Sequence, residues 1–194
     1  SIENLIKNIN KDVGNLDFVV HALAYSDKEE LKGKYVETSR QNFLSTLDIS
    51  TYSFTRISKS ASKIMSNGGS LLTLTYVGSN KTTPNYNVMG VAKAALETSV
   101  KYLSVDLGKN NIRVNAISAG PMKTIAGAAI SGARHVYRYS EKIAPLQKNP
   151  DLEQVGNAAL YLLSDISSGV TGLTHYVDGG LKVVGIPNQD IVNI

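Results

Sequence analysis

The apolar positions along the chain alternate between the spacing of a helix and the spacing of a strand. Residues 1–14 carry isoleucine or leucine at positions 2, 5, 6 and 9, which places them on one face of a helix. Residues 16–24 form a short run of apolar and β-branched residues, typical of a strand buried in a parallel sheet. The same alternation continues and predicts helices at 40–65, 85–111 and 151–165 and strands at 70–76, 112–120 and 172–180.

This alternation predicts βαβ units, and therefore a parallel sheet with helices on both faces. The sequence contains no internal repeat, linker or low-complexity tract, so residues 1–194 are expected to form one domain. Residues 122–150 are predicted to be an irregular, partly helical insertion. The chain opens on a helix, and the G-x-G-x-x-G turn that usually follows the first strand of a doubly wound sheet does not occur in it. We therefore expect the chain to be the C-terminal part of a longer α/β protein.

Composition narrows the range of functions. Hydrophobic residues make up 42% of the chain, charged residues make up 19%, and no apolar run approaches the roughly 18 residues of a membrane span. The sequence has no cysteine, which excludes disulfides and thiolate metal sites and fits a cytoplasmic location. The net charge of +4 is spread out, so neither nucleic acid nor a membrane is expected as a partner. His21, His135 and His175 lack the spacing of metal ligands, so no metal is expected.

Tyr86 and Lys93 are the residues most suited to chemistry. Seven residues turn a helix through about 700°, so the two side chains would leave a helix within about 20° of each other and roughly 10.5 Å apart along its axis. Pro84 suits the start of such a helix, and Asn85 is the predicted N-cap. A phenol there can stabilise a developing oxyanion, and an ammonium can hold hydroxyl groups. Taken alone, such a pair is more often a surface tyrosine and a surface lysine that share one helix face by chance.

The surrounding sequence favours the functional interpretation. Residues 70–124, from "SLLTLTY" through "NYNVMGVAKAALE" to "RVNAISAGPMKT", resemble the catalytic half of the short-chain dehydrogenase/reductase superfamily. The common Tyr-x3-Lys motif is absent, because Gly90 stands four residues after Tyr86 and Met89 stands four before Lys93. Tyr-x6-Lys, with Tyr76 ten residues earlier, resembles a divergent branch, the bacterial enoyl-acyl-carrier-protein reductases. "LDFVVHALAY", "LYLLSDISSGVTG" and "HYVDGG" extend the resemblance over nearly the whole chain.

The resemblance implies a Rossmann-type doubly wound parallel sheet that lacks its first strands in this chain. It also implies NADH-dependent reduction of a trans-2-enoyl thioester on acyl carrier protein, the last reductive step of fatty-acid elongation, in a homotetramer. NADPH in place of NADH stays open. Two alternatives to this function are a ketoreductase of the same superfamily and a non-catalytic binding subunit.

The resemblance also assigns roles to individual residues. Tyr86 would hydrogen-bond the thioester carbonyl, and Lys93 would bind the nicotinamide ribose. Tyr76 would line the site or else serve as a packing residue at the end of a strand. Besides Lys93, the implied cofactor contacts are Leu23, Met122, Lys123, Thr124, Ile125 and Ala126. The implied substrate contacts are Ser26, Tyr76, Tyr86 and Ala126.

Residues 124–140 match the substrate-binding segment of the family, within a lid at about 122–150. Arg134 and Arg138 lie four apart on a predicted helix in this segment, where they would meet an acidic carrier protein or form a solvated helix face. Ala22 and Ala24 stand where the family usually has serine and glycine, a departure that puts hydrogen bonds from that turn in doubt. Met122 replaces a more usual isoleucine at nearly conserved volume.

Overall fold

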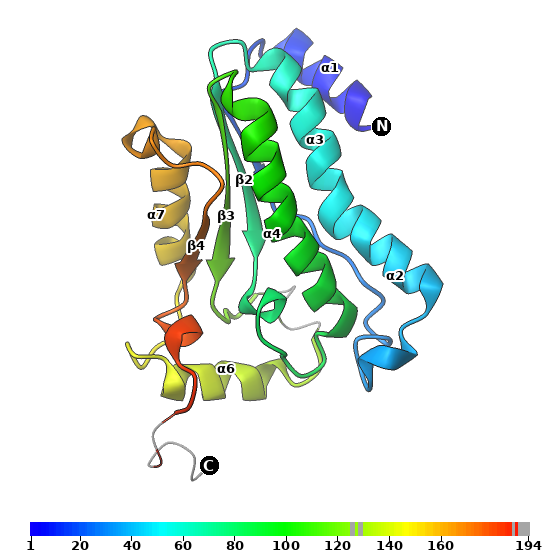
Figure 1. The fold of residues 1–194 in the computed structure, drawn as a ribbon, viewed down its shortest axis with the longest axis vertical. Helices are drawn as coiled ribbons and strands as arrows, with labels where there is room; N and C mark the ends of the chain where they lie inside the picture. Colours follow the sequence, from blue (N-terminus) through cyan, green and yellow to red (C-terminus); the bar gives the residue numbers. More distant parts are fainter. Residues whose placement is uncertain (125–126, 128–129, 188, 190–194) are drawn as a thin grey trace.

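Four parallel strands form the sheet of the computed structural model, which describes residues 1–124, 127, 130–187 and 189 (Figure 1). The spatial order β1-β2-β3-β4 follows the order along the chain. The strands are β1 (Phe18–His21), β2 (Gly69–Thr75), β3 (Ile112–Ala119) and β4 (Thr174–Val177). Val19 pairs with Leu71, Leu71 with Val114, and Ile117 with His175. The predicted parallel α/β sheet is therefore confirmed.

Six α-helices are defined within the described residues. They are α1 (Ile2–Asp12), α2 (Arg40–Leu47), α3 (Ser53–Ala61), α4 (Asn87–Gly108), α6 (Ala133–Ile143) and α7 (Leu152–Leu163). In Figure 1, α1 to α4 lie on one side of the sheet, α7 lies on the other, and α6 crosses beneath the ends to which the strand arrows point. Two helical layers therefore enclose the sheet, as the alternation predicts.

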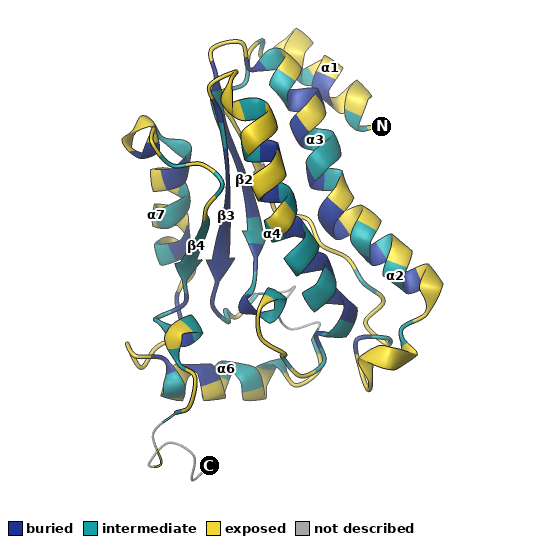
Figure 2. Cartoon of the chain, in the orientation of Figure 1, coloured by how far each residue is buried: buried dark blue, intermediate teal, exposed yellow. Residues whose placement is uncertain are grey.

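Side-chain alternation along the strands gives each layer its own core. Leu71 and Val114 face the layer of α3 and α4 and pack with Phe54, whereas Leu72 and Ile117 face α7. All five side chains are fully buried. Figure 2 shows β2 and β3 buried along most of their length, while the outer faces of α4 and α7 are exposed. The buried sheet therefore holds the carboxyl ends of the strands in fixed positions, and α/β proteins bind their ligands at these ends.

The crossover connection from β3 to β4 has the opposite handedness to the two connections before it. All three connections step across the sheet in the same direction, yet α7 packs on the face opposite α4. Parallel crossovers are right-handed in about 98% of cases, so this departure needs local support. Arg113 donates to the carbonyl oxygens of Leu162 and Ser164, and Asn115 donates to that of Val170. These bonds fasten the end of α7 and the following loop to β3.

Several predicted elements have different boundaries in the structure. The helix expected at 40–65 is divided by a π-helical turn at Asp48–Tyr52, and the strand expected at 16–24 spans only Phe18–His21. The helix expected from residue 85 begins at Asn87, so Tyr86 occupies the N-cap position. The helix predicted around Arg134 and Arg138 is α6. In the portion of the chain that the structure describes, no helix is both long and apolar enough to cross a bilayer.

Candidate active site

The candidate site lies at the carboxyl ends of the strands. Tyr76 follows the last residue of β2, and Tyr86 immediately precedes α4. Their rings meet nearly edge to face, with centroids 5.1 Å apart and planes at 68°. This arrangement is favourable for aromatic pairs and restricts the rotation of both phenols. The fold therefore brings the two predicted tyrosines together.

Two glycines allow this close approach. A Cβ atom added to Gly78 would lie 2.5 Å from Cδ1 and 2.7 Å from Cε1 of Tyr86, far inside van der Waals contact. A Cβ atom on Gly90 would lie 2.7 Å from the Gly78 carbonyl oxygen. Position 90 is where Tyr-x3-Lys would require a lysine, and the backbone there leaves no space for a side chain. The lysine of this site therefore has to come from elsewhere on α4.

Tyr86 is buried with its hydroxyl in the neutral form. Its side chain is 6% exposed and belongs to an apolar cluster with Leu31, Val88 and Met89. Burial raises the pKa of the Tyr86 phenol well above its ordinary value, and the nearby Tyr76 and Glu97 raise this pKa further. At neutral pH the hydroxyl is therefore a hydrogen-bond donor.

Lys93 is buried two turns into α4, below the end of β2. It is 7% exposed, and its Nζ donates to the Leu74 carbonyl oxygen over 2.8 Å. Burial lowers the pKa of Lys93 to about 8, against an opposing effect of Glu97. The ammonium is therefore mostly charged at neutral pH and lies beside the backbone that leads to Tyr76.

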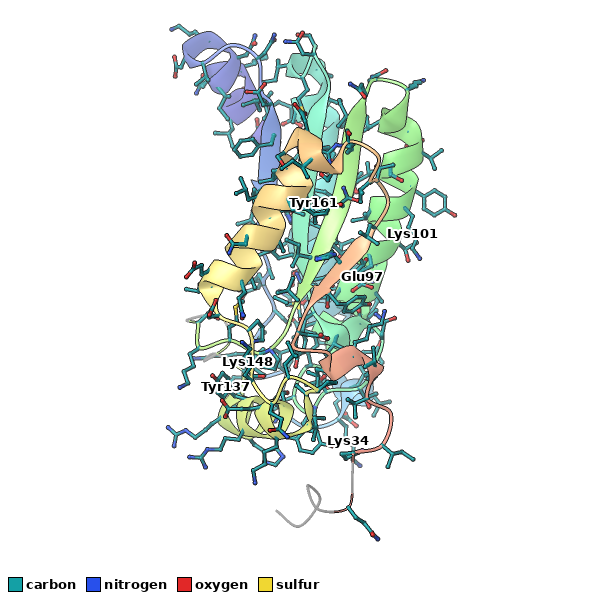
Figure 3. The ribbon with its side chains drawn as sticks, turned by 90° about the vertical axis from the view of Figure 1, so that its left-hand side faces the viewer. Lys34, Glu97, Lys101, Tyr137, Lys148 and Tyr161 are labelled. Atoms are coloured by element: carbon teal, nitrogen blue, oxygen red, sulfur yellow. The ribbon has the colours of Figure 1, made fainter. Side chains whose placement is uncertain are left out.

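Glu97 is a member of the site that the sequence reasoning missed. Its carboxylate accepts hydrogen bonds from the hydroxyls of Thr75 and Ser79 and, over 3.2 Å, from the Asn80 side chain. It therefore binds both ends of the segment that carries Tyr76. Figure 3 shows Glu97 on α4 beside β4, in agreement with the contact between Asn80 and the Tyr176 hydroxyl. Its position four residues after Lys93, on the same helix face, was the available signal.

The turn after β1 joins the site to α2. Leu23 is 55% exposed there. This exposure is compatible with a cofactor contact made by its backbone. The Ser26 hydroxyl oxygen accepts from Thr46 Oγ1 over 3.0 Å and from Asn42 Nδ2 over 3.2 Å. Ser26 therefore holds the turn against α2, and its contact with substrate stays a prediction.

The segment after β3 holds the remaining predicted cofactor contacts. Met122 packs against the core on the α7 face, and Lys123 Nζ lies 5.0 Å from the centre of the Tyr137 ring. Thr124 Oγ1 accepts from the backbone N–H of Gly127 over 3.0 Å. Ile125 and Ala126 lie outside the residues that the structure describes. The side chains of Met122, Lys123 and Thr124 are thus occupied locally, which is compatible with cofactor contacts made by the backbone.

His21 has a structural position at the end of β1. Its ring nitrogens contact the hydroxyls of Ser53 at 2.8 Å and Thr73 at 3.0 Å. Burial, and then the nearby charge of Lys93, lower the pKa of His21 to about 4. The ring is therefore neutral at physiological pH. Within the described ranges, no group of three histidine, cysteine or acidic side chains is arranged to hold a metal.

The structure corrects the helical argument for Tyr86 and Lys93. Because Tyr86 precedes the helix, an ideal seven-residue rotation does not relate the two side chains. Asn85 is not the N-cap and has a left-handed backbone with φ of 57°. Both candidate side chains are nonetheless buried near the N-terminal end of α4, on the side of the strand ends. Their convergence results from the bend at residues 85–87 as well as from helical spacing.

A parallel α/β sheet with a buried tyrosine and a buried lysine at its carboxyl edge is the arrangement expected of a Rossmann-type oxidoreductase. The family model described as enoyl-(acyl carrier protein) reductase matches residues 1–182. The chain belongs to this family.

Two curated relatives and one solved structure illustrate the likeness. Enoyl-acyl-carrier-protein reductase (NADH) 1 of Rhizobium meliloti strain 1021 is 55% identical over the whole chain, which covers 71% of that relative. The NADPH enzyme FabI of Staphylococcus aureus strain MRSA252 is 50% identical over 93% of this chain and 71% of its own. The enoyl-acyl-carrier-protein reductase of Anaplasma phagocytophilum, solved in complex with NAD, superposes with a TM-score of 0.93 and 56% identity over 97% of this chain and 72% of that chain.

Proposed function

We propose that this chain reduces trans-2-enoyl thioesters carried on acyl carrier protein, with NADH as the reductant, in fatty-acid elongation. Membership of the enoyl-acyl-carrier-protein reductase family supports this reaction. The observation that carries the residue assignment is the contact between the partly buried Tyr76 and the buried Tyr86, a contact that Gly78 allows. The Lys93 ammonium lies beneath the end of β2. Tyr86, Tyr76 and Lys93 are the proposed catalytic groups.

Lys93 is the proposed contact for the nicotinamide ribose. A bound nicotinamide cofactor supplies the hydride in this reaction. The Lys93 ammonium has three donors, of which the Leu74 carbonyl accepts one, so donors are available for ribose hydroxyls. The backbone around Leu23 and at 122–124 would line the same cofactor, together with Ile125 and Ala126. NADPH is the alternative reductant, because the Staphylococcus relative is named as an NADPH enzyme.

Tyr86 is proposed to stabilise the charge that develops on the substrate. Hydride addition at C3 of an enoyl thioester drives negative charge onto the C1 carbonyl oxygen, away from the carbon that is reduced. A neutral phenol can donate a hydrogen bond to that oxygen, and a preorganised donor of this kind contributes about 3 kcal/mol to transition-state stabilisation. The edge-to-face contact with Tyr76 holds the phenol in place. The proton that completes the reduction comes from Tyr86 or from a water relayed through it.

The carrier protein is proposed to bind over α6. Arg134 and Arg138 are exposed on this helix, and so is Lys142, which continues the same four-residue spacing. The helix lies across the carboxyl ends of the strands (Figure 1), as expected of a lid at 122–150 that receives an acyl chain. We extend the proposal to a cytoplasmic homotetramer, with α2–α3 and α4 as contact helices; Tyr102 and Val105 are 73% and 78% exposed on α4.

One assay separates this function from its alternatives. The purified protein receives NADH or NADPH with either a trans-2-enoyl or a 3-ketoacyl thioester, and oxidation of the cofactor is followed by absorbance. Oxidation with the enoyl substrate alone is the expected result. Oxidation with the ketone alone would make the protein a ketoreductase, and no oxidation with either substrate would favour a binding subunit.

A substitution tests the assignment of Lys93. Lys93→Ala removes the ammonium, so we expect the dissociation constant for NADH to rise at least about tenfold, the loss of one charge-assisted hydrogen bond. Isothermal titration calorimetry measures this constant directly. Wild-type affinity in the variant would show that Lys93 does not bind the cofactor.

A further inference from the structure

Tyr86 stands between two asparagines with unusual backbone conformations. The described residues include four non-glycine residues with positive φ, and two of these are Asn85 at 57° and Asn87 at 35°. Asparagine tolerates this left-handed region better than most residues, but the conformation still costs free energy. Such backbones persist where the surrounding structure holds them in place. The tripeptide that carries the phenol is therefore held from outside.

The side chains of both asparagines supply that restraint. Asn85 Nδ2 donates to the Ser131 carbonyl oxygen over 2.9 Å. Asn87 Nδ2 donates to the carbonyl oxygens of Leu31, over 3.0 Å, and Gly33, over 3.3 Å. The accepting backbones belong to the segment before α6 and to the loop that follows β1. The two amides thus connect the tyrosine to two separate segments at the carboxyl edge of the sheet.

The apolar packing follows the same two connections. Leu31 is a buried member of the cluster around Tyr86, and Ile130 packs against that cluster from the segment before α6. Each hydrogen bond from an asparagine side chain therefore lies beside an apolar contact from the same segment. Neither asparagine caps α4, because its N-cap is Tyr86 and the helix has no side-chain cap. Asparagine is among the most favoured N-cap residues, so the use of both amides elsewhere calls for another role.

We propose that Asn85 and Asn87 are positioning residues, which fix the direction of the Tyr86 phenol by tethering its backbone to Ser131 on one side and to residues 31–33 on the other. The proposal rests on the function proposed for Tyr86. Loss of either tether frees the backbone, and displacement of a catalytic group by about 1 Å can cost about 100-fold in rate. The cofactor contacts of Lys93 are a separate matter and should not change.

Glycine substitution separates the tether from the backbone conformation. Asn85→Gly and Asn87→Gly keep the left-handed conformation accessible and remove only the amide. Asn111→Gly is the matched control, because Asn111 has φ of 58°, is exposed, and lies in the turn before β3. We expect Asn85→Gly and Asn87→Gly to lower kcat at least tenfold with the NADH dissociation constant within twofold of wild type. Asn111→Gly should keep the wild-type kcat.

A double-mutant cycle with Tyr86→Phe identifies the group through which the asparagines act. Single-turnover rates at excess enzyme make the slow variants measurable. We expect Asn85→Gly to lower the single-turnover rate at least tenfold in the wild-type background. In the Tyr86→Phe background the same substitution should lower the rate less than twofold. An equal loss in both backgrounds, or a kcat equal to that of Asn111→Gly, would overturn the proposal. A wild-type rate in Tyr86→Phe alone would instead overturn the function proposed for Tyr86.

Discussion

Gly78→Ala is a direct steric test of the site. The added Cβ atom would meet Tyr86 at 2.5 Å and 2.7 Å and Tyr76 at 3.2 Å. Ordinary contact begins near 3.4 Å, so the Tyr86 ring has to move by about 1 Å. A displacement of this size costs about 100-fold in rate, which corresponds to about 2.7 kcal/mol of transition-state stabilisation. Overpacking should also lower the free energy of unfolding by about 1–3 kcal/mol.

The assay compares steady-state reduction of an enoyl thioester with urea unfolding of the same preparations. Gly156→Ala is the control: Gly156 lies on the exposed side of α7, and an added Cβ there meets nothing within 4 Å. Alanine loses less backbone entropy than glycine within a helix, so Gly156→Ala should raise the free energy of unfolding by about 0.5–1 kcal/mol without affecting turnover. If Gly78→Ala keeps wild-type kcat at full stability, the position of the Tyr86 ring does not limit catalysis.

Four further predictions concern charge and assembly. Because burial lowers the pKa of Lys93 to about 8, NADH binding should weaken as pH rises through 8; calorimetry that shows constant affinity from pH 7 to about 9.5 would contradict this. The pKa of His21 falls from 6.5 to about 4 on folding, so the unfolded chain takes up the proton first. The free energy of unfolding should decrease by up to about 3 kcal/mol between pH 6.5 and 4, and His21→Gln should lack this part of the decrease in urea unfolding. Arg134→Glu with Arg138→Glu should raise KM about tenfold for substrate on acyl carrier protein and leave KM for a coenzyme A thioester unchanged; an equal rise for both would exclude carrier recognition. Val105→Asp should dissociate the proposed tetramer in light scattering, and an unchanged mass would place the interface elsewhere.

Much of the fold could be predicted from hydrophobic periodicity, because each element has a buried face. Leu71 and Leu72 belong to a run that is apolar on both sides, and such a run is typical of a parallel strand between two helical layers. Hydrophobic periodicity does not predict the opposite handedness of the crossover from β3 to β4. This crossover is accompanied by hydrogen bonds from Arg113 to the end of α7 and from Asn115 to the loop that follows it, which join residues about 50 positions apart.

The candidate site could be predicted only in part. Tyr86 and Lys93 were found through their spacing and the resemblance of the surrounding sequence. The boundary of α4 was predicted two residues too early, because Pro84 and Asn85 are typical of a helix start. The side chain of Asn85 instead bonds to Ser131, a contact that no local pattern encodes. Glu97 lies four residues after Lys93 on the same helix face, but its hydrogen-bond partners come from the segment around Tyr76, which this spacing does not indicate.

The central claim is that the Tyr86 hydroxyl stabilises the enolate oxygen of the substrate while Lys93 holds the cofactor. The most direct test is the single-turnover rate of enoyl thioester reduction by Tyr86→Phe at saturating NADH. Removal of one such donor costs about 100- to 1,000-fold, so we predict a rate at least about 100-fold below wild type. A rate within twofold of wild type would contradict the claim.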